Sequence, residues 1–218
     1  MIVRDLGLTP YHQALDAQLR RRAEVQAGAE ATLFLVEHPP VVTLGRRGKV
    51  DGLLVSRETL DAQGIELAHA ARGGDVTCHF PGQLVAYPIM RLDRRPGGVR
   101  AFFHDLEEVV LRALAELDIT ARRRHGRAGV WVQDRKIASV GVAVKHWTTY
   151  HGLALNVARD LSLFRLIHPC GDPATRPTSV ATELDDDSIT MEQVKNVLIQ
   201  HFQAVFAHPE LAAGQAAD

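Results

Sequence analysis

Cys170 and Lys136 are the residues whose types and positions best suit covalent chemistry. Cys170 stands between Pro169 and Gly171, which predicts a loop, whereas structural cysteines usually occupy helices or strands. A loop thiol is a candidate nucleophile, and it becomes reactive where its surroundings favour the thiolate. Its position alone leaves a structural thiol equally open.

Lys136 follows Asp134 and Arg135, a pair that resembles a hairpin turn, so we expect it to begin the returning strand. A lysine beside a turn is commonly a surface residue. The residues after it, Ile137 to Gly141, are small and apolar, which is typical of an interior strand. Lys136 could therefore enter a cleft, where a partly desolvated amine can exchange protons.

The other cysteine, Cys78, lies beside His79 and suggests a Cys–His pair. On a strand, however, neighbouring side chains point to opposite faces. His79 would then share a face with Thr77, and Cys78 would share the other face with Val76. We therefore interpret Cys78 as a core residue.

Two further segments are rich in residue types that bind substrates. The first, Arg72 to Gln83, contains arginine, paired glycines, threonine and histidine, and glycine amides can bind a carbonyl or a phosphate. A plain turn would explain the glycine pair as well. The second segment, His151 to Asn156, precedes the loop of Cys170.

Composition and charge exclude several classes of protein. The chain has 218 residues, a formal charge of −1, 46% hydrophobic residues and 23% charged residues. These values predict a globular protein with a full core and imply no nucleic-acid partner. Two cysteines do not make a disulfide framework, the N-terminus does not resemble a signal peptide, and no run suits a membrane span. We expect a soluble, cytoplasmic protein.

Motifs for metals and nucleotides are missing from the sequence. There is no CxxC or HxxxH pair, and the eleven histidines are scattered, so we predict no metal site. There is also no GxxxxGK[ST] phosphate-binding loop. We expect no cofactor.

The hydrophobic pattern predicts many strands and a few separated helices. Helices are expected after Pro10, with Tyr11, Leu15, Leu19 and Ala23 on one stripe, over 99–117, and from Thr190 to about Phe206 with a Thr190–Gln193 capping box. Strands are expected at 32–36, 41–44, 66–71, 76–79, 83–89, 119–123, 130–133, 138–145 and 153–157. The pattern favours one α+β domain around a mixed sheet over residues 1–208, followed by a flexible polar tail at 209–218.

In order along the chain, these motifs resemble the octanoyltransferases of lipoic acid synthesis. The match begins with Glu37 to Arg46 and continues through Arg72 to Gln83. It then includes Lys136-Ile137-Ala138-Ser139, His151-Gly152-Leu153-Ala154-Leu155-Asn156, Pro169-Cys170-Gly171 and Thr178-Ser179-Val180. The resemblance implies the mixed-sheet fold shared with biotin and lipoate ligases, with helices flanking the sheet.

The resemblance also implies an activity and its residues. An octanoyl group would pass from acyl carrier protein, through a thioester on Cys170, to a lysine of lipoyl domains in 2-oxoacid dehydrogenases or of the glycine cleavage H protein. Lys136 would be the acid and base that also activates the thiol. The substrate site would be lined by Arg72, Gly73, Gly74, Asp75, Val76, Thr77, Cys78, His79, Ser139, Val140, Gly141, Gly152, Leu153 and Ala154.

Two positions depart from the family pattern. The family usually has tyrosine or phenylalanine at Cys78 and commonly glycine at Phe80, so we expect Phe80 to add bulk near the acyl chain.

Arg46, Arg47 and Lys49 could dock an acidic carrier, and a solvated turn explains them equally well. The competing functions are an ATP-dependent lipoate or biotin ligase, a non-catalytic carrier-binding relative, and a thiol hydrolase.

Overall fold

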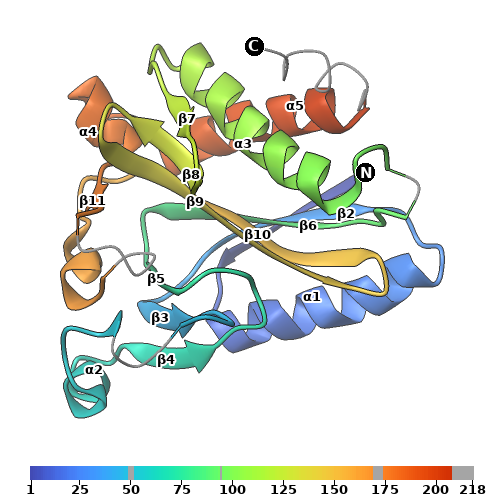
Figure 1. Ribbon diagram of the computed structural model, residues 1–218. Helices are drawn as coiled ribbons and strands as arrows, with labels where there is room; N and C mark the ends of the chain where they lie inside the picture. The colour runs from blue at the N-terminus through green and yellow to red at the C-terminus, as the bar shows by residue number, and fades with distance from the viewer. Residues whose placement is uncertain (49–51, 94, 169–173, 208–218) are drawn as a thin grey trace.

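The computed structural model describes residues 1–48, 52–93, 95–168 and 174–207. Its strands form one large mixed sheet and one small sheet (Figure 1). The large sheet has the order β1 (Ile2–Leu8), β2 (Thr32–Glu37), β6 (Gln83–Ile89), β10 (Thr148–Asn156), β9 (Arg135–Lys145), β8 (Arg127–Val132) and β7 (Arg122–Arg124), with β11 (Arg176–Pro177) paired to β9. The small sheet has the order β4 (Glu66–His69), β3 (Val41–Leu44) and β5 (Val76–His79).

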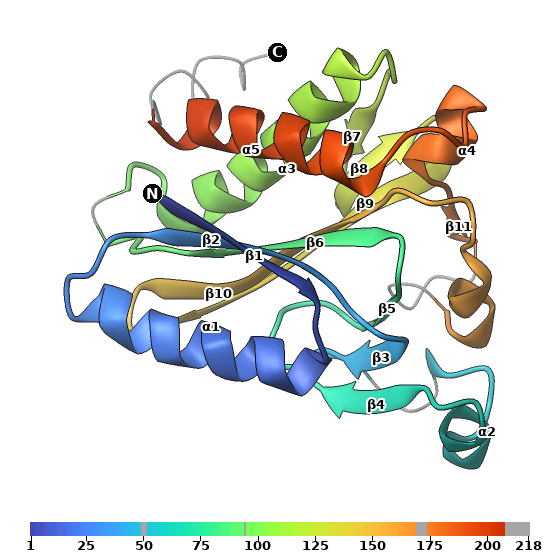
Figure 2. The same cartoon turned by 180° about the vertical axis from the view of Figure 1, so that it is seen from behind.

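Helices cover both faces of the large sheet, as Figures 1 and 2 show. The helices are α1 (Tyr11–Gln26), α2 (Arg57–Ala62), α3 (Gly98–Glu116), α4 (Val180–Leu184) and α5 (Met191–Ala207), with a 3-10 turn at Ser162–Leu166. Because strand side chains alternate, Leu33 and Leu35 of β2 join the core under α3 and α5. Phe34 and Val36 join the opposite core under α1. The predicted mixed sheet flanked by helices is confirmed.

The predicted helix at 99–117 is confirmed nearly to its ends, because its apolar residues Phe102, Leu106, Val109 and Ala113 form one fully buried stripe. The start of α5 is confirmed as well. The Thr190 amide donates to Gln193 Oε1 at 2.8 Å, and the Gln193 amide donates to Thr190 Oγ1 at 3.2 Å. This reciprocal pair is the predicted capping box.

The apolar stripe of α1 is only partly buried. The fully buried residues of this helix are Tyr11, Ala14, Gln18, Arg21 and Val25, while Leu15 and Leu19 pack at the edge of the core and Ala23 is exposed. Two polar side chains on this face have buried partners: Gln18 Oε1 accepts from the His151 amide, and Arg21 Nε donates to Thr32 Oγ1. Hydrogen bonds therefore outweigh hydropathy in setting how this helix sits on the sheet.

Several strand bounds also differ from the prediction. The strand expected at 119–123 is reduced to Arg122–Arg124, because Ile119 instead closes the end of α3 by donating its amide to Leu114 O. The turn before β9 is formed by Gln133 and Asp134, so Arg135 opens the strand and Lys136 is its second residue. Strand β1 was not predicted. Among the described residues, no helix has the length and apolar character that a bilayer crossing requires.

Candidate active site

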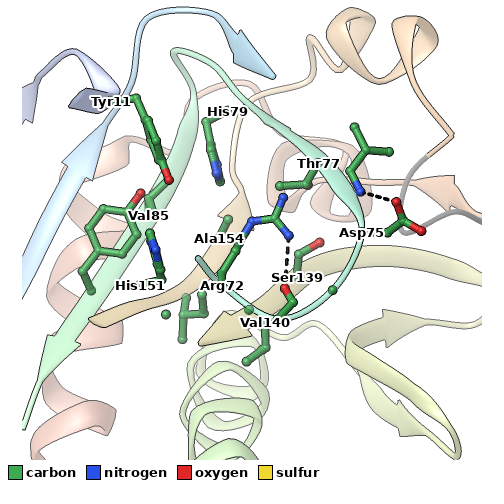
Figure 3. Close-up of a pocket in the computed structure, with 17 residues that line it drawn as sticks. Tyr11, Arg72, Asp75, Thr77, His79, Val85, Ser139, Val140, His151 and Ala154 are labelled. Carbon is green, nitrogen blue, oxygen red and sulfur yellow. Dashed lines mark hydrogen bonds between the residues drawn. The ribbon is translucent and has the colours of Figure 1, made fainter. Parts of the chain in front are cut away.

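An inner cavity lies between the large sheet, the start of α1 and the strand β5. It encloses about 520 Å³ of space not filled by atoms, its mouth included. Its walls are the residues Tyr11, Arg72, Gly73, Gly74, Asp75, Val76, Thr77, His79, Val85, Tyr87, Ser139, Val140, Gly141, His151, Gly152, Leu153 and Ala154 (Figure 3). Every residue predicted to line the substrate site is therefore here, with the exception of Cys78.

Cys78 and Phe80 lie outside this cavity. Cys78 is fully buried in the apolar cluster under the small sheet, as strand alternation predicts for a core residue. The ring of Phe80 packs edge-on against Phe164 in the same cluster, with 5.7 Å between the ring centres. The expectation that Phe80 adds bulk to the site is thus wrong, because Phe80 follows Cys78 by two residues and its ring packs into the same cluster.

Arg72 supplies a buried guanidinium to the inner cavity. Its Nη2 atom donates to the Thr43 carbonyl at 2.7 Å and to Thr43 Oγ1 at 2.8 Å, which ties the loop after β4 to the small sheet. Gly141 permits this approach, because a Cβ there would lie 3.1 Å from Arg72 Cδ. The amide of Gly73 donates to the Val142 carbonyl, so it is already used by the fold.

Tyrosine and histidine side chains gather at the opposite wall. His38 Nε2 lies 2.8 Å from Tyr87 Oη, and the ring of Tyr11 stacks near that of His79, with 6.4 Å between centres. Burial lowers the pKa of His79 well below its usual value, and the nearby His38 adds to the effect. Burial, helped by the charge of Arg72, lowers the pKa of His151 to about 3. Both imidazoles are therefore neutral at pH 7.

A buried hydrogen-bond chain connects the inner cavity to β11. His79 Nδ1 lies 2.7 Å from Gln83 Oε1, Gln83 Nε2 donates to Asn156 Oδ1, and Asn156 Nδ2 donates to the Thr178 carbonyl. The Thr178 amide then donates to the Lys136 carbonyl at 3.0 Å. Gln83 and Asn156, which belong to the sequence motifs, thus fix the segment beside Lys136.

A second, outer cavity adjoins the first and contains Lys136. It encloses about 970 Å³, its mouth included, and is lined by Arg47, Gly74, Asp75, Gly126, Arg127, Ala128, Trp131, Lys136, Val140 and Thr175. Gly74, Asp75 and Val140 line both cavities, so the two spaces meet there. Of the two described basic residues predicted to dock a carrier, Arg46 and Arg47, the second lines this cavity.

Lys136 is buried and packed against its neighbours, although lysine side chains are usually exposed. The residue is 6% exposed, and Nζ lies 5.4 Å from the centre of the Trp131 ring, whose face attracts a cation. Gly129 makes room for it, since a Cβ there would lie 2.7 Å from Lys136 Cε. The prediction that Lys136 enters a cleft is confirmed.

Cys170 lies outside the described residues, together with Pro169, Gly171, Lys49 and the tail at 209–218. The described chain on both sides of it is anchored. His168 donates its amide to the Gly52 carbonyl at 2.8 Å, and Pro177 pairs with Lys136 in the β11–β9 ladder. Thr175 lines the outer cavity.

Sequence reasoning missed several side chains of the inner cavity, chiefly Tyr11, Val85 and Tyr87. Tyr11 looks like an ordinary first-turn residue after Pro10, and Val85 and Tyr87 like strand residues. His151 was within a recognised motif but had no assigned role. Its neighbourhood gave a signal, because histidine before glycine in an apolar run is unusual for a strand core.

Comparison with known proteins identifies the family. The model of the lipoyl protein ligase A/B catalytic domain matches residues 10–203. An octanoyltransferase of Nitratidesulfovibrio vulgaris strain DP4 is 59% identical over 100% of both chains. The octanoyltransferase of Deinococcus radiodurans is 46% identical over 99% of this chain and 69% of its own length.

Solved structures show the same fold. A lipoate-protein ligase A bound with ATP has a TM-score of 0.77 at 21% identity, covering 95% of this chain and 86% of that one. A biotin protein ligase from Aquifex aeolicus has a TM-score of 0.56 at 12% identity, covering 95% and 69%. The predicted ligase-like fold is confirmed. By family model and by full-length relatives, the chain belongs to the lipoyl protein ligase A/B family, among its octanoyltransferases, and is an acyltransferase.

Proposed function

We propose that the protein moves an octanoyl group from acyl carrier protein to a lysine of a lipoyl domain, through a thioester on Cys170. The observation that carries the proposal is the junction of the two cavities at Gly74, Asp75 and Val140. An acyl chain in the inner cavity would bring its carbonyl carbon to this junction, next to the outer cavity that contains Lys136. The acceptors would be lipoyl domains of 2-oxoacid dehydrogenases and the glycine cleavage H protein.

In the first step, the Cys170 thiolate attacks the carbonyl carbon of the carrier thioester. A new carbon–sulfur bond forms on Cys170, and the bond to the carrier's thiol breaks. The departing sulfur takes a proton from the Lys136 ammonium. This covalent intermediate divides the transfer into two displacements at a single site.

In the second step, the lysine amine of the acceptor attacks the Cys170 thioester. A carbon–nitrogen bond forms, Cys170 leaves as a thiolate, and Lys136 takes the proton that the amine loses. Thiolate and ammonium are thereby restored for the next cycle. Because a thioester is converted to an amide, the reaction runs downhill without ATP.

The position of Lys136 suits this alternation of roles. A general acid and base must stay in place while it loses and regains a proton. The Trp131 ring and the space at Gly129 hold the Lys136 side chain, and the Thr178 amide holds its backbone carbonyl. Asn156 and Gln83 hold Thr178 in turn.

The chain on either side of Cys170 supports its role as nucleophile. Thr175, five residues after Cys170, lines the same cavity as Lys136, and five extended residues span at most about 18 Å. This length of chain would let Cys170 reach the proposed reaction centre. A cytoplasmic setting, which keeps thiols reduced, suits a thiolate nucleophile.

Backbone amides at the junction are the candidates for binding the developing oxyanion. Since Gly73 already donates to Val142, we favour Gly74 and the segment 139–141. The aliphatic walls Val76, Val85, Val140 and Leu153 would take the acyl chain. Each buried methylene contributes about 0.8 kcal/mol, so these walls alone distinguish neighbouring chain lengths only a few-fold.

The test is an ATP-free transfer assay. Purified protein, octanoyl-carrier protein and a lipoyl domain are mixed, and the acceptor is followed by mass spectrometry. We expect one octanoyl mass on the acceptor, absent when its target lysine is replaced by arginine. A parallel reaction with octanoic acid and ATP tests the ligase alternative. Product formed only in that reaction would overturn the proposal.

A further inference from the structure

One end of the inner cavity is polar, although an octanoyl chain ends in a methyl group. His151 pairs with Val142, six residues after Lys136 along β9. At about 3.3 Å per residue, this register puts His151 about 20 Å along the strand from Lys136. Figure 3 shows Tyr11 and His151 together on one side of Arg72, with Thr77 and Asp75 on the other. We call the part of the cavity lined by Tyr11 and His151 the inner end.

Two buried polar atoms at the inner end lack a hydrogen-bond partner among the described residues. They are the hydroxyl of Tyr11, a residue 3% exposed, and Nε2 of His151, a residue 2% exposed. Of the polar groups beside them, Tyr87 Oη pairs with His38 and His79 Nδ1 with Gln83, whereas Gln18 Nε2 also has no partner among the described residues. An unsatisfied buried group is costly, so native proteins rarely keep one without a reason.

The backbone conformation of His151 also indicates that the inner end has a function. Its φ is +58° in the middle of a strand, a conformation that a residue with a side chain seldom adopts. The Gln18 side chain holds it there by accepting the His151 amide at 2.8 Å. Strain of this kind is concentrated at functional sites, where it aims a side chain.

The Tyr11 hydroxyl and the His151 ring are both uncharged and can form hydrogen bonds to a neutral partner. Burial raises the pKa of Tyr11 to about 12, so its hydroxyl remains protonated. The pKa of His151, lowered to about 3 by burial, leaves a neutral ring whose Nε2 donates or accepts according to the tautomer. A hydroxyl or carbonyl oxygen is the partner that such a pair suits.

We propose that the inner end is a polar subsite, and that the protein also transfers acyl chains bearing a hydroxyl or oxo oxygen near the end remote from the thioester. The transfer chemistry is unchanged: the thioester carbon–sulfur bond breaks and the amide bond forms. The inference rests on the proposed function, because it assigns the distal end of the acyl chain to the inner end of the cavity.

The experiment compares two acyl groups of equal length in heavy atoms, ω-hydroxyoctanoyl and nonanoyl, each as the carrier-protein thioester. They compete for transfer to a lipoyl domain, and mass spectrometry gives their ratio of kcat/KM. Octanoyl transfer is measured alongside. The variants are Tyr11→Phe, His151→Asn, which keeps a residue tolerant of positive φ, and Tyr150→Phe, which removes a phenol hydroxyl outside the cavity walls.

We expect the wild type to transfer ω-hydroxyoctanoyl at least as well as nonanoyl. Tyr11→Phe and His151→Asn should each lower the ratio about three- to tenfold, the equivalent of one neutral hydrogen bond, and Tyr150→Phe should leave it unchanged. Since the ratio is internal to each variant, a general loss of activity does not affect it. A wild type that prefers nonanoyl tenfold or more, or a ratio unmoved by Tyr11→Phe, would overturn the inference. Absence of octanoyl transfer by the wild type would overturn the proposed function itself.

Discussion

The inner and outer cavities share Gly74, Asp75 and Val140 but differ in how their polar groups are held. In the inner cavity, the histidines are buried and uncharged at pH 7, and neighbouring side chains hold them: His79 Nδ1 pairs with Gln83, and Gln18 accepts the His151 amide. In the outer cavity, Lys136 and two arginines border an open space. Binding groups can be fixed during folding, whereas a proton-transferring group must face its substrates.

The largest effect should come from removing the amine of the outer cavity. Replacing Lys136 by alanine should lower kcat/KM for octanoyl transfer by about 10²–10⁴-fold, the usual contribution of a general acid and base. Lys145→Ala is the matched control, because Lys145 is exposed at the far end of the same strand. Equal losses in both variants would remove the distinction between the two cavities.

The next effect concerns the space that Gly129 leaves for Lys136. A Cβ at Gly129, whose φ is +112°, would lie 2.4 Å from the Ala138 carbonyl and would displace Lys136. Gly129→Ala should therefore cost roughly 2–5 kcal/mol of stability, from backbone strain and overpacking, and should lower kcat.

Gly126 provides the control for that variant. It lies in the same hairpin with φ +73°, and a Cβ there would meet nothing within 4 Å. Gly126→Ala should cost only about 1–2 kcal/mol in urea unfolding, with kcat retained. If both variants lost kcat alike, the effect would be one of general stability.

The inner cavity should make the protein sensitive to acid. The pKa of His151 falls from 6.5 to about 3 on folding, so between these values the unfolded chain binds a proton that the native state does not. Stability should be complete above pH 6.5 and should fall as the pH drops, by about 1.4 kcal/mol per pH unit for this residue. Urea unfolding at pH 7 and pH 5 measures the loss. His151→Asn should reduce it by about 2 kcal/mol, and an undiminished loss would contradict the neutral, buried histidine.

The smallest effect is expected for the ion pair between Arg135, the residue before Lys136, and Glu183. Arg135 donates to both carboxylate oxygens of Glu183, from Nε at 2.9 Å and from Nη2 at 2.8 Å. Because the arginine is partly exposed, solvent screens the pair. A double-mutant cycle with Arg135→Gln and Glu183→Gln should give a coupling of about 1 kcal/mol or less. A coupling of several kcal/mol would contradict the view that solvent screens this pair.

The sequence predicted most of the long elements and the residues of the motifs, because local periodicity reports which face is buried. The helix at Gly98–Glu116 is the clearest case. The sequence could not show that β2 and β3, close in the chain, belong to different sheets. It also could not show that Gln18 contacts His151, since hydrogen bonds between distant polar residues leave no periodic trace. Phe80 was misplaced for a different reason: strand alternation puts it on the face of Val76 and Cys78, where it lies, and the expectation that it enters the site came from the family pattern alone.

The central claim is that Cys170 carries the acyl group between donor and acceptor. Intact-protein mass spectrometry after incubation with octanoyl-carrier protein, with no acceptor present, tests it directly. The wild type and Cys78→Ala should each gain one octanoyl mass, because Cys78 is buried in the core away from both cavities. Cys170→Ala should gain none. An octanoyl adduct that persists in Cys170→Ala would contradict the account.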